Sequence, residues 1–227
     1  MIPFTRDYKV HRFLLLVSLI PLLAAIILRK LNADRILRRD GQQLLHHPAD
    51  GTARKMLDSM GHEKVKLVQK QSLWPVTGDA AQKSVQLPDM SKKRNHPALV
   101  ETHGLAALRA GIFLLSQREP AVTAKRDWAL RFGHVFPIFT TIVVIFAFAV
   151  GKLPVLWGLS IVVGSLGIAS CAQVLALACE RRAATLAAVV IEKKRIFPRL
   201  SEEEAVITAA RAQAWRAIVP GFLSRLM

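Results

Sequence analysis

The chain has 227 residues, of which 52% are hydrophobic, and its mean hydropathy is +0.31. The apolar residues stand in long uncharged blocks, which excludes an ordinary soluble domain and predicts an integral membrane protein. Thirty-two lysines and arginines oppose 16 acidic residues, which gives a formal net charge of +16. Such an excess suits nucleic acid or an anionic membrane surface, and the apolar blocks favour the lipid bilayer over nucleic acid as the partner.

Residues 13–28 form the first apolar block, with Arg12 and Arg29 at its two ends. Because arginine side chains can extend to the headgroups, these 16 uncharged residues suffice to span the hydrocarbon layer. A cleaved signal peptide is the alternative, since basic residues also precede the block. No small-residue cleavage site follows it, so we predict that residues 1–31 are a retained N-terminal transmembrane anchor.

Residues 32–133 are predicted to form a small α+β polar region. Asp50 is expected to cap a helix that Gly61 ends, because the apolar residues between them recur at helical spacing. Two short strands are also predicted, at 65–67 and 84–87, with a turn between them at 74–79. This region therefore reads as helix, strand, turn and strand.

Residues 135–150 and 155–179 contain no charged side chain, and four residues join them. Two long apolar helices with so short a connection predict an antiparallel transmembrane hairpin over residues 134–179. Neither apolar block carries a carboxylate or a base on which a proton or ion pathway could run, which argues against a transporter.

Residues 180–227 are predicted to be a C-terminal helical segment. Ser201 and Glu204 suggest a capping box at the start of its last helix. That helix is amphipathic, and we expect it at the membrane interface or against the hairpin. The expected fold class is therefore a mainly α membrane protein with three transmembrane helices, the N-terminal anchor and the C-terminal hairpin, together with a small α+β polar region and an amphipathic C-terminal helix.

Basic residues flank both feet of the predicted hairpin, while Lys152 is the single basic residue at its tip. The positive-inside rule therefore places the feet and residues 32–133 in the cytoplasm, although the basic residues within 1–12 oppose this orientation. The basic residues beside the apolar blocks are also the expected contacts for anionic lipid: Arg29, Lys30, Arg35, Arg38, Arg39, Lys125, Arg126, Arg131, Arg181 and Arg182.

Four features occur in a fixed order along the chain. They are a soluble helix at 51–61 after the first span, a turn and strand at 73–87, the uncharged hairpin, and the downstream segments 180–184 and 200–204. In these features the chain resembles the bacterial membrane-bound neutral zinc metallopeptidases of the YugP type, over about residues 10–227. The resemblance implies a metallopeptidase-like polar region and a location in a bacterial inner membrane.

The resemblance also implies an HExxH motif on a helix that we expect to start near Pro97 and to be buried or interfacial. In that motif two histidines ligate zinc and the glutamate polarises the attacking water. A gapless placement puts Leu105, Ala106 and Arg109 at these three positions, and none of them can perform the role. The third, acidic ligand of the family would lie near Glu180. The resemblance therefore implies a zinc cofactor only if it extends to metal binding through other residues, and we expect no cofactor.

Four other residues are the remaining candidate metal ligands: His96, Glu101, His103 and Glu180. On a helix His96 and His103 are separated by a rise of roughly 10 Å, and Glu101 and His103 point about 200° apart. This spacing does not predict a metal site.

We therefore favour a pseudoenzyme, a catalytically inactive member of such a family that acts as a binding or regulatory scaffold for a membrane protein or peptide partner. One alternative is an active membrane zinc metallopeptidase with displaced ligands, although no second histidine lies within a helical turn of His103. The other alternative is a basic membrane anchor that binds anionic lipid.

Overall fold

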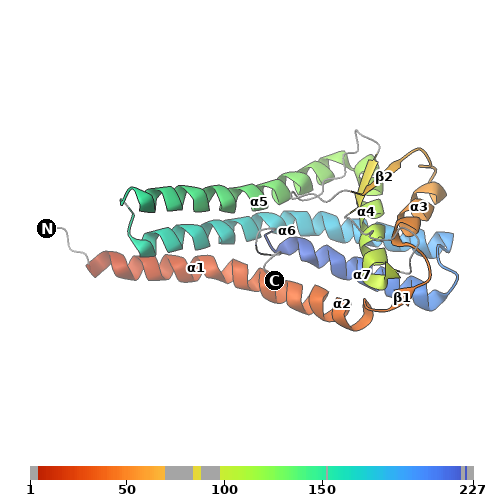
Figure 1. Cartoon of the computed structure of the whole chain (residues 1–227), viewed down its shortest axis with the longest axis horizontal. Helices are drawn as coiled ribbons and strands as arrows, with labels where there is room; N and C mark the ends of the chain where they lie inside the picture. Colours follow the sequence, from red (N-terminus) through yellow and green to blue (C-terminus); the bar gives the residue numbers. More distant parts are fainter. Residues whose placement is uncertain (1–4, 70–83, 88–97, 152, 221–222, 224–227) are drawn as a thin grey trace.

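The structure is a computed structural model that describes residues 5–69, 84–87, 98–151, 153–220 and 223. Three of its helices are long and apolar enough to cross a membrane, within 15–40, 120–149 and 155–194. They lie side by side as an elongated stem, and the shorter elements gather at one end of it as a head (Figure 1). The prediction of a mainly helical protein with three candidate membrane spans is thus confirmed.

The first span belongs to a helix that continues beyond the predicted anchor. Helix α1 (Thr5–Arg29) passes through a π-helical segment, η1 (Lys30–Asp34), into α2 (Arg35–Asp40) without a break. Ala33 and Leu37 are buried in the core of the head. The continuation therefore ties the membrane-spanning helix to the head.

The hairpin consists of α5 (Pro120–Ala149) and α6 (Val155–Lys194), two antiparallel helices joined at a turn where Gly151 has a φ of 69°. Small residues let the helices approach closely, as is common in membranes. A Cβ atom on Gly133 would meet the side chain of Gln173, and one on Gly167 would meet the carbonyl oxygen of Ser18 in α1. Large apolar side chains point outward along the stem, among them Ile20, Phe139, Ile145, Phe146 and Val155. Such a surface suits lipid.

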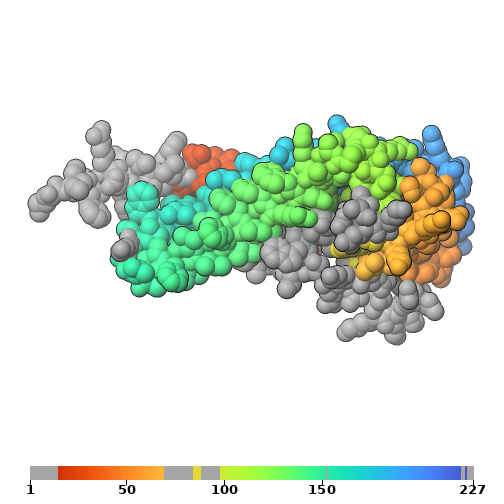
Figure 2. Space-filling view, turned by 90° about the horizontal axis from the view of Figure 1, so that it is seen from above, coloured from red at the N-terminus to blue at the C-terminus, as the bar shows by residue number. Residues whose placement is uncertain are grey.

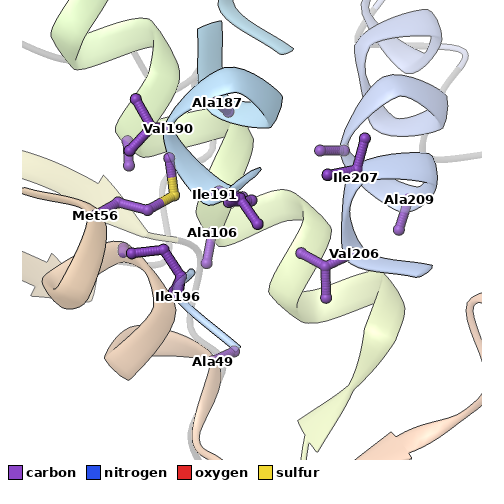
Figure 3. Close-up of a cluster of buried hydrophobic side chains, with 14 of the residues drawn as sticks. Ala49, Met56, Ala106, Ala187, Val190, Ile191, Ile196, Val206, Ile207 and Ala209 are labelled. Carbon is purple, nitrogen blue, oxygen red and sulfur yellow. The ribbon is translucent and has the colours of Figure 1, made fainter. Parts of the chain in front are cut away.

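The head encloses an apolar core between α3 (Ala49–Ser59), α4 (Val100–Arg118), the end of α6 and α7 (Leu200–Ala214). A 3₁₀ turn, η3 (Trp215–Ile218), follows α7. Figure 3 shows part of this core, with labelled side chains Ala49, Met56, Ala106, Ala187, Val190, Ile191, Ile196, Val206, Ile207 and Ala209. In the space-filling view α5 runs along the stem, and α3 lies at the end of the head beside the C-terminal part of the chain (Figure 2).

Two pairs of short strands complete the head. Strand β1 (Leu44–Leu45) pairs antiparallel with β4 (Ala98–Leu99), and β2 (Lys66–Gln69) pairs parallel with β3 (Ser84–Leu87). Both predicted strands are therefore present. Parallel strands cannot be joined by a tight hairpin turn. The predicted turn at 74–79 lies outside the described residues.

The predicted helix caps are only partly correct. Gly61 follows α3 with a φ of 79°, as expected for a helix end. Asp50 is not the N-cap, because α3 begins at Ala49 and the Asp50 carboxylate accepts a hydrogen bond from Gly51 N at 2.9 Å. The capping box at Ser201 is also wrong, since α7 already begins at Leu200 and its N-cap makes no side-chain hydrogen bond.

Candidate functional site

The turn of α4 that the resemblance assigns to catalysis lies inside the head. Ala106, at the position of the expected glutamate, is fully buried in the same apolar cluster as Met56 and Ile191 (Figure 3). Leu105 and Arg109 are partly buried. A general base must reach water and substrate, whereas the side chain at this position contacts the dry core.

Four charged side chains gather where α4, α5 and α6 meet, and we call them the charge cluster: Arg109, Arg126, Asp127 and Glu180. Arg126 donates from Nε and Nη2 to Glu180 Oε1 at 2.8 and 2.5 Å, and from Nη1 to Asp127 Oδ1 at 2.7 Å. Arg126 is 1% exposed and Glu180 4% exposed. Buried charges require such pairing, and two cations here balance two anions.

Arg109 joins this cluster from α4. Burial lowers the pKa of Arg109, and the neighbouring carboxylate of Glu180 opposes that effect. Arg109, at the position of the expected second histidine, is therefore electrostatically coupled to Glu180, which lies near the position of the expected acidic ligand. A positively charged side chain, rather than a metal-binding one, interacts electrostatically with Glu180.

The other candidate ligands have separate partners. His103 is fully buried, its Nδ1 is hydrogen bonded to Thr52 Oγ1 at 2.7 Å, and burial lowers its pKa to about 4. Glu101 Oε1 accepts instead from Arg216 Nη1 at 2.7 Å. His96 lies outside the described residues. Among the residues that the structure describes, no three His, Cys, Asp or Glu side chains gather as a metal site would require.

These residues do not fit the zinc centre that the resemblance implies. Leu105 and Arg109 provide no ligand atom, and Glu180 Oε1 already accepts two charge-assisted hydrogen bonds from Arg126. The residue at the position of the base, Ala106, has no titratable group. The misfit rests on the chemistry of the side chains present.

The ten basic residues expected at anionic lipid divide into two groups. Arg29 and Arg126 are buried, and their carboxylate partners, Asp34 and Glu180, lie within the protein. Both therefore lie next to an internal carboxylate, and the prediction that they contact anionic lipid stays a prediction. The remaining eight are exposed: Lys30, Arg35, Arg38, Arg39, Lys125, Arg131, Arg181 and Arg182.

Basic residues of all three long helices come to one level along the stem. Arg126 of α5 reaches Glu180 of α6, which fixes the register of the hairpin. Ser18 of α1 lies against Gly167 of α6, and the two helices run in the same direction (Figure 1). Eleven residues further along each helix, Arg29 of α1 therefore stands near the level of Ala178 of α6. This level follows directly after the apolar blocks, where lipid headgroups are expected.

A groove of about 650 Å³ lies at this level between the end of α4 and α6. Its lining residues are Leu115, Arg118, Glu119, Ala178, Arg181, Arg182, Thr185, Leu186 and Val189. Arg182 Nη1 donates to Glu119 Oε2 across it at 3.2 Å. Arg118 in the groove and Asp127 in the charge cluster carry no sequence signal that separates them from solvated charges beside a span.

Three comparisons with known proteins test whether these features occur elsewhere. The likeness to membrane zinc metallopeptidases rests on the residues of this chain alone. No protein-family model, no curated protein and no solved structure matches this chain.

Proposed function

We propose that the protein is a pseudoenzyme of the membrane, a binding or regulatory scaffold built like a membrane zinc metallopeptidase but without its hydrolytic centre. The observation that carries this proposal is the burial of Ala106 in an apolar cluster (Figure 3). A hydrolytic glutamate would need water at that position, and the core leaves it none.

The charge cluster supports the same proposal. In a zinc centre the metal supplies the positive charge beside an acidic ligand. Here Arg126 and Arg109 supply that charge beside Glu180, so the carboxylate is neutralised without a metal. The α4–α5–α6 junction is thereby held together in a form suited to binding rather than to hydrolysis.

The groove at the junction of head and stem is the surface that we assign to a partner. Three of its side chains are arginines and one is a glutamate, while Leu115, Leu186 and Val189 provide apolar contacts. This lining complements a peptide segment that carries both acidic and apolar side chains, such as the juxtamembrane part of another membrane protein.

In this proposal the protein lies in a bacterial inner membrane with its head in the cytoplasm. The exposed basic residues at the level where the stem meets the head support that orientation, because cytoplasmic flanks of membrane spans are enriched in lysine and arginine. A reporter enzyme fused after residue 60 should be active in the cytoplasm only, and activity on the opposite side would contradict the orientation.

The test of the missing hydrolytic centre is metal content together with hydrolysis. We expect detergent-purified protein to hold well below one zinc per chain and to cleave neither casein nor peptides in a chelator-sensitive manner. Stoichiometric zinc with such cleavage would instead establish the alternative of an active metallopeptidase with displaced ligands. A His103→Gln variant would then have to lower the zinc content.

The test of the groove uses a synthetic peptide with alternating acidic and apolar residues. Arg118→Gln should weaken its binding by about tenfold, as expected for loss of one charge-assisted contact. Arg131→Gln removes the same charge from an exposed position outside the groove and should have little effect. Equal losses in the two variants would argue against a defined binding surface.

A further inference from the structure

A second, smaller cavity of about 290 Å³ lies where η1 and α2 meet the start of α4 and η3. We call it the arginine pocket, and its lining residues are Arg29, Asp34, Leu37, Arg38, Glu101 and Arg216. Five of these six side chains are charged, although the pocket lies beside the end of a membrane-spanning helix. A charged pocket in this place calls for a polar occupant.

The internal ion pairs leave the arginine pocket with a surplus of positive charge. Glu101 pairs with Arg216 at 2.7 Å. Asp34 lies 3.7 Å from Arg29 Nε and 3.9 Å from Arg216 Nε, distances too long for hydrogen bonds. Three guanidinium groups face two carboxylates, so one positive charge has no counterpart among the residues that line the pocket.

Guanidinium donors in the pocket also lack acceptors. Arg29 is only 7% exposed, and its Nε and Nη1 atoms have no hydrogen-bond acceptor among the described residues. The buried Nε atom of Arg216 likewise has no hydrogen-bond acceptor among the described residues. A buried N–H group without an acceptor is costly. The forked N–H donors of a guanidinium group match the oxygens of phosphate and carboxylate groups.

The place of the pocket in the stem suggests where the phosphate comes from. Arg29 is the last residue of α1 and directly follows the apolar block 13–28. The pocket therefore lies next to the headgroup layer, and a phosphodiester carries the single negative charge that the pocket lacks. We propose that the arginine pocket binds the phosphodiester of an anionic phospholipid headgroup.

This site goes beyond the scaffold proposal, because it names a ligand and does not depend on whether a hydrolytic centre is present. It also differs from general attraction to a negative surface. General attraction acts on every exposed basic residue at short range, whereas the pocket distinguishes two neighbouring arginines of α2. Arg38 lines the pocket, and Arg39 is exposed and does not.

The experiment uses the delipidated full chain in a neutral detergent. Binding of phosphatidylglycerol, phosphatidylcholine and inorganic phosphate is measured by native mass spectrometry and by the shift in unfolding temperature. We expect phosphatidylglycerol to bind and stabilise the protein most. Arg38→Gln should weaken that binding by about tenfold, and Arg39→Gln by less than about twofold, because only the first removes a donor that faces the ligand.

Arg216→Gln removes a deeper donor and should weaken binding further, but it also breaks an ion pair with Glu101. If that variant does not fold, the comparison of Arg38→Gln with Arg39→Gln still tests the proposal. Equal losses in this pair would overturn the proposal in favour of surface attraction. Stabilisation by inorganic phosphate without any lipid preference would overturn the lipid source, and no effect of any of the three ligands would show that water satisfies the donors.

Discussion

Ala106→Glu tests whether the expected position of the base is a dry part of the core. Ala106 is 0% exposed and belongs to the apolar cluster of the head. A carboxyl introduced there must enter the fold in its neutral form. From an ordinary pKa of about 4.3 for glutamate, protonation at pH 7 costs about 3.7 kcal/mol, and overpacking adds about 1–3 kcal/mol. The sum approaches the whole stability of many domains.

The ionisation part of this cost has a definite pH dependence. The folded-state pKa of the introduced carboxyl is raised, so the variant loses stability as pH rises above the unfolded-state pKa of about 4.3. The extra cost should fall from about 3.7 kcal/mol at pH 7 to about 1 kcal/mol at pH 5. Ala106→Gln is the matched control, because it has nearly the same size and no titratable group.

The measurement is denaturant unfolding in mild detergent, followed by tryptophan fluorescence, to which Trp215 contributes from its place against the core of the head. Parent, glutamate variant and glutamine variant are compared between pH 5 and 7. A glutamate variant as stable as the parent would mean that water reaches position 106. So would a stability gap between the two variants that does not change with pH. Either result would refute the main support for a missing hydrolytic centre.

Three further tests of packing and charge use the same assay. Glu180→Gln should cost about 3–5 kcal/mol because it removes one of the two carboxylates that pair with the buried Arg126 and leaves the charge cluster with excess positive charge. Glu119→Gln in an exposed pair should cost less than about 1 kcal/mol. Equal costs would contradict the burial of the charge cluster. Gly104→Ala would place a Cβ atom 2.6 Å from the Cβ atom of Ala209 in α7 and should destabilise the fold by about 1–3 kcal/mol. A Cβ atom on Gly164 would meet nothing within 4 Å, so Gly164→Ala should be neutral or slightly stabilising. The folded-state pKa of His103, about 4, lies below its ordinary value of 6.5. Its neutral form therefore stabilises the fold fully above pH 6.5, and up to about 3 kcal/mol is lost as pH falls toward 4. The parent protein should show this loss and His103→Gln should not, so parallel pH profiles would refute the assignment.

The long apolar helices were predictable because their signal is local. Uncharged blocks at 135–150 and 155–179 with a four-residue connection leave few alternatives to a pair of long helices. The strands at 65–67 and 84–87 were also readable from alternation. Their parallel pairing was not, because register and direction depend on a connection that carries no such pattern. The capping signals at Asp50 and Ser201 failed because each helix begins two residues earlier than the signal implies.

The charge cluster lay beyond local signals for a different reason. Arg126 and Glu180 are 54 residues apart, and only the packing of α5 on α6 brings them together. The sequence could show that Arg109 is out of place in an apolar stretch. It could not show that Glu180 supplies the compensating charge, because every helix flank in this chain carries charged residues.

Part of that missing information was nevertheless present in the phase of α5. Among its buried residues, Thr123, Arg126, Leu130, Gly133 and Pro137 recur every three or four positions and lie on one inner face. Arg126 falls on that face with Gly133, whereas Lys125 and Arg131 fall outside it and are exposed. A glycine and a proline inside an apolar helix mark the side where another helix approaches closely. A basic residue in phase with them is therefore expected to need an internal carboxylate, and one out of phase is free to meet lipid.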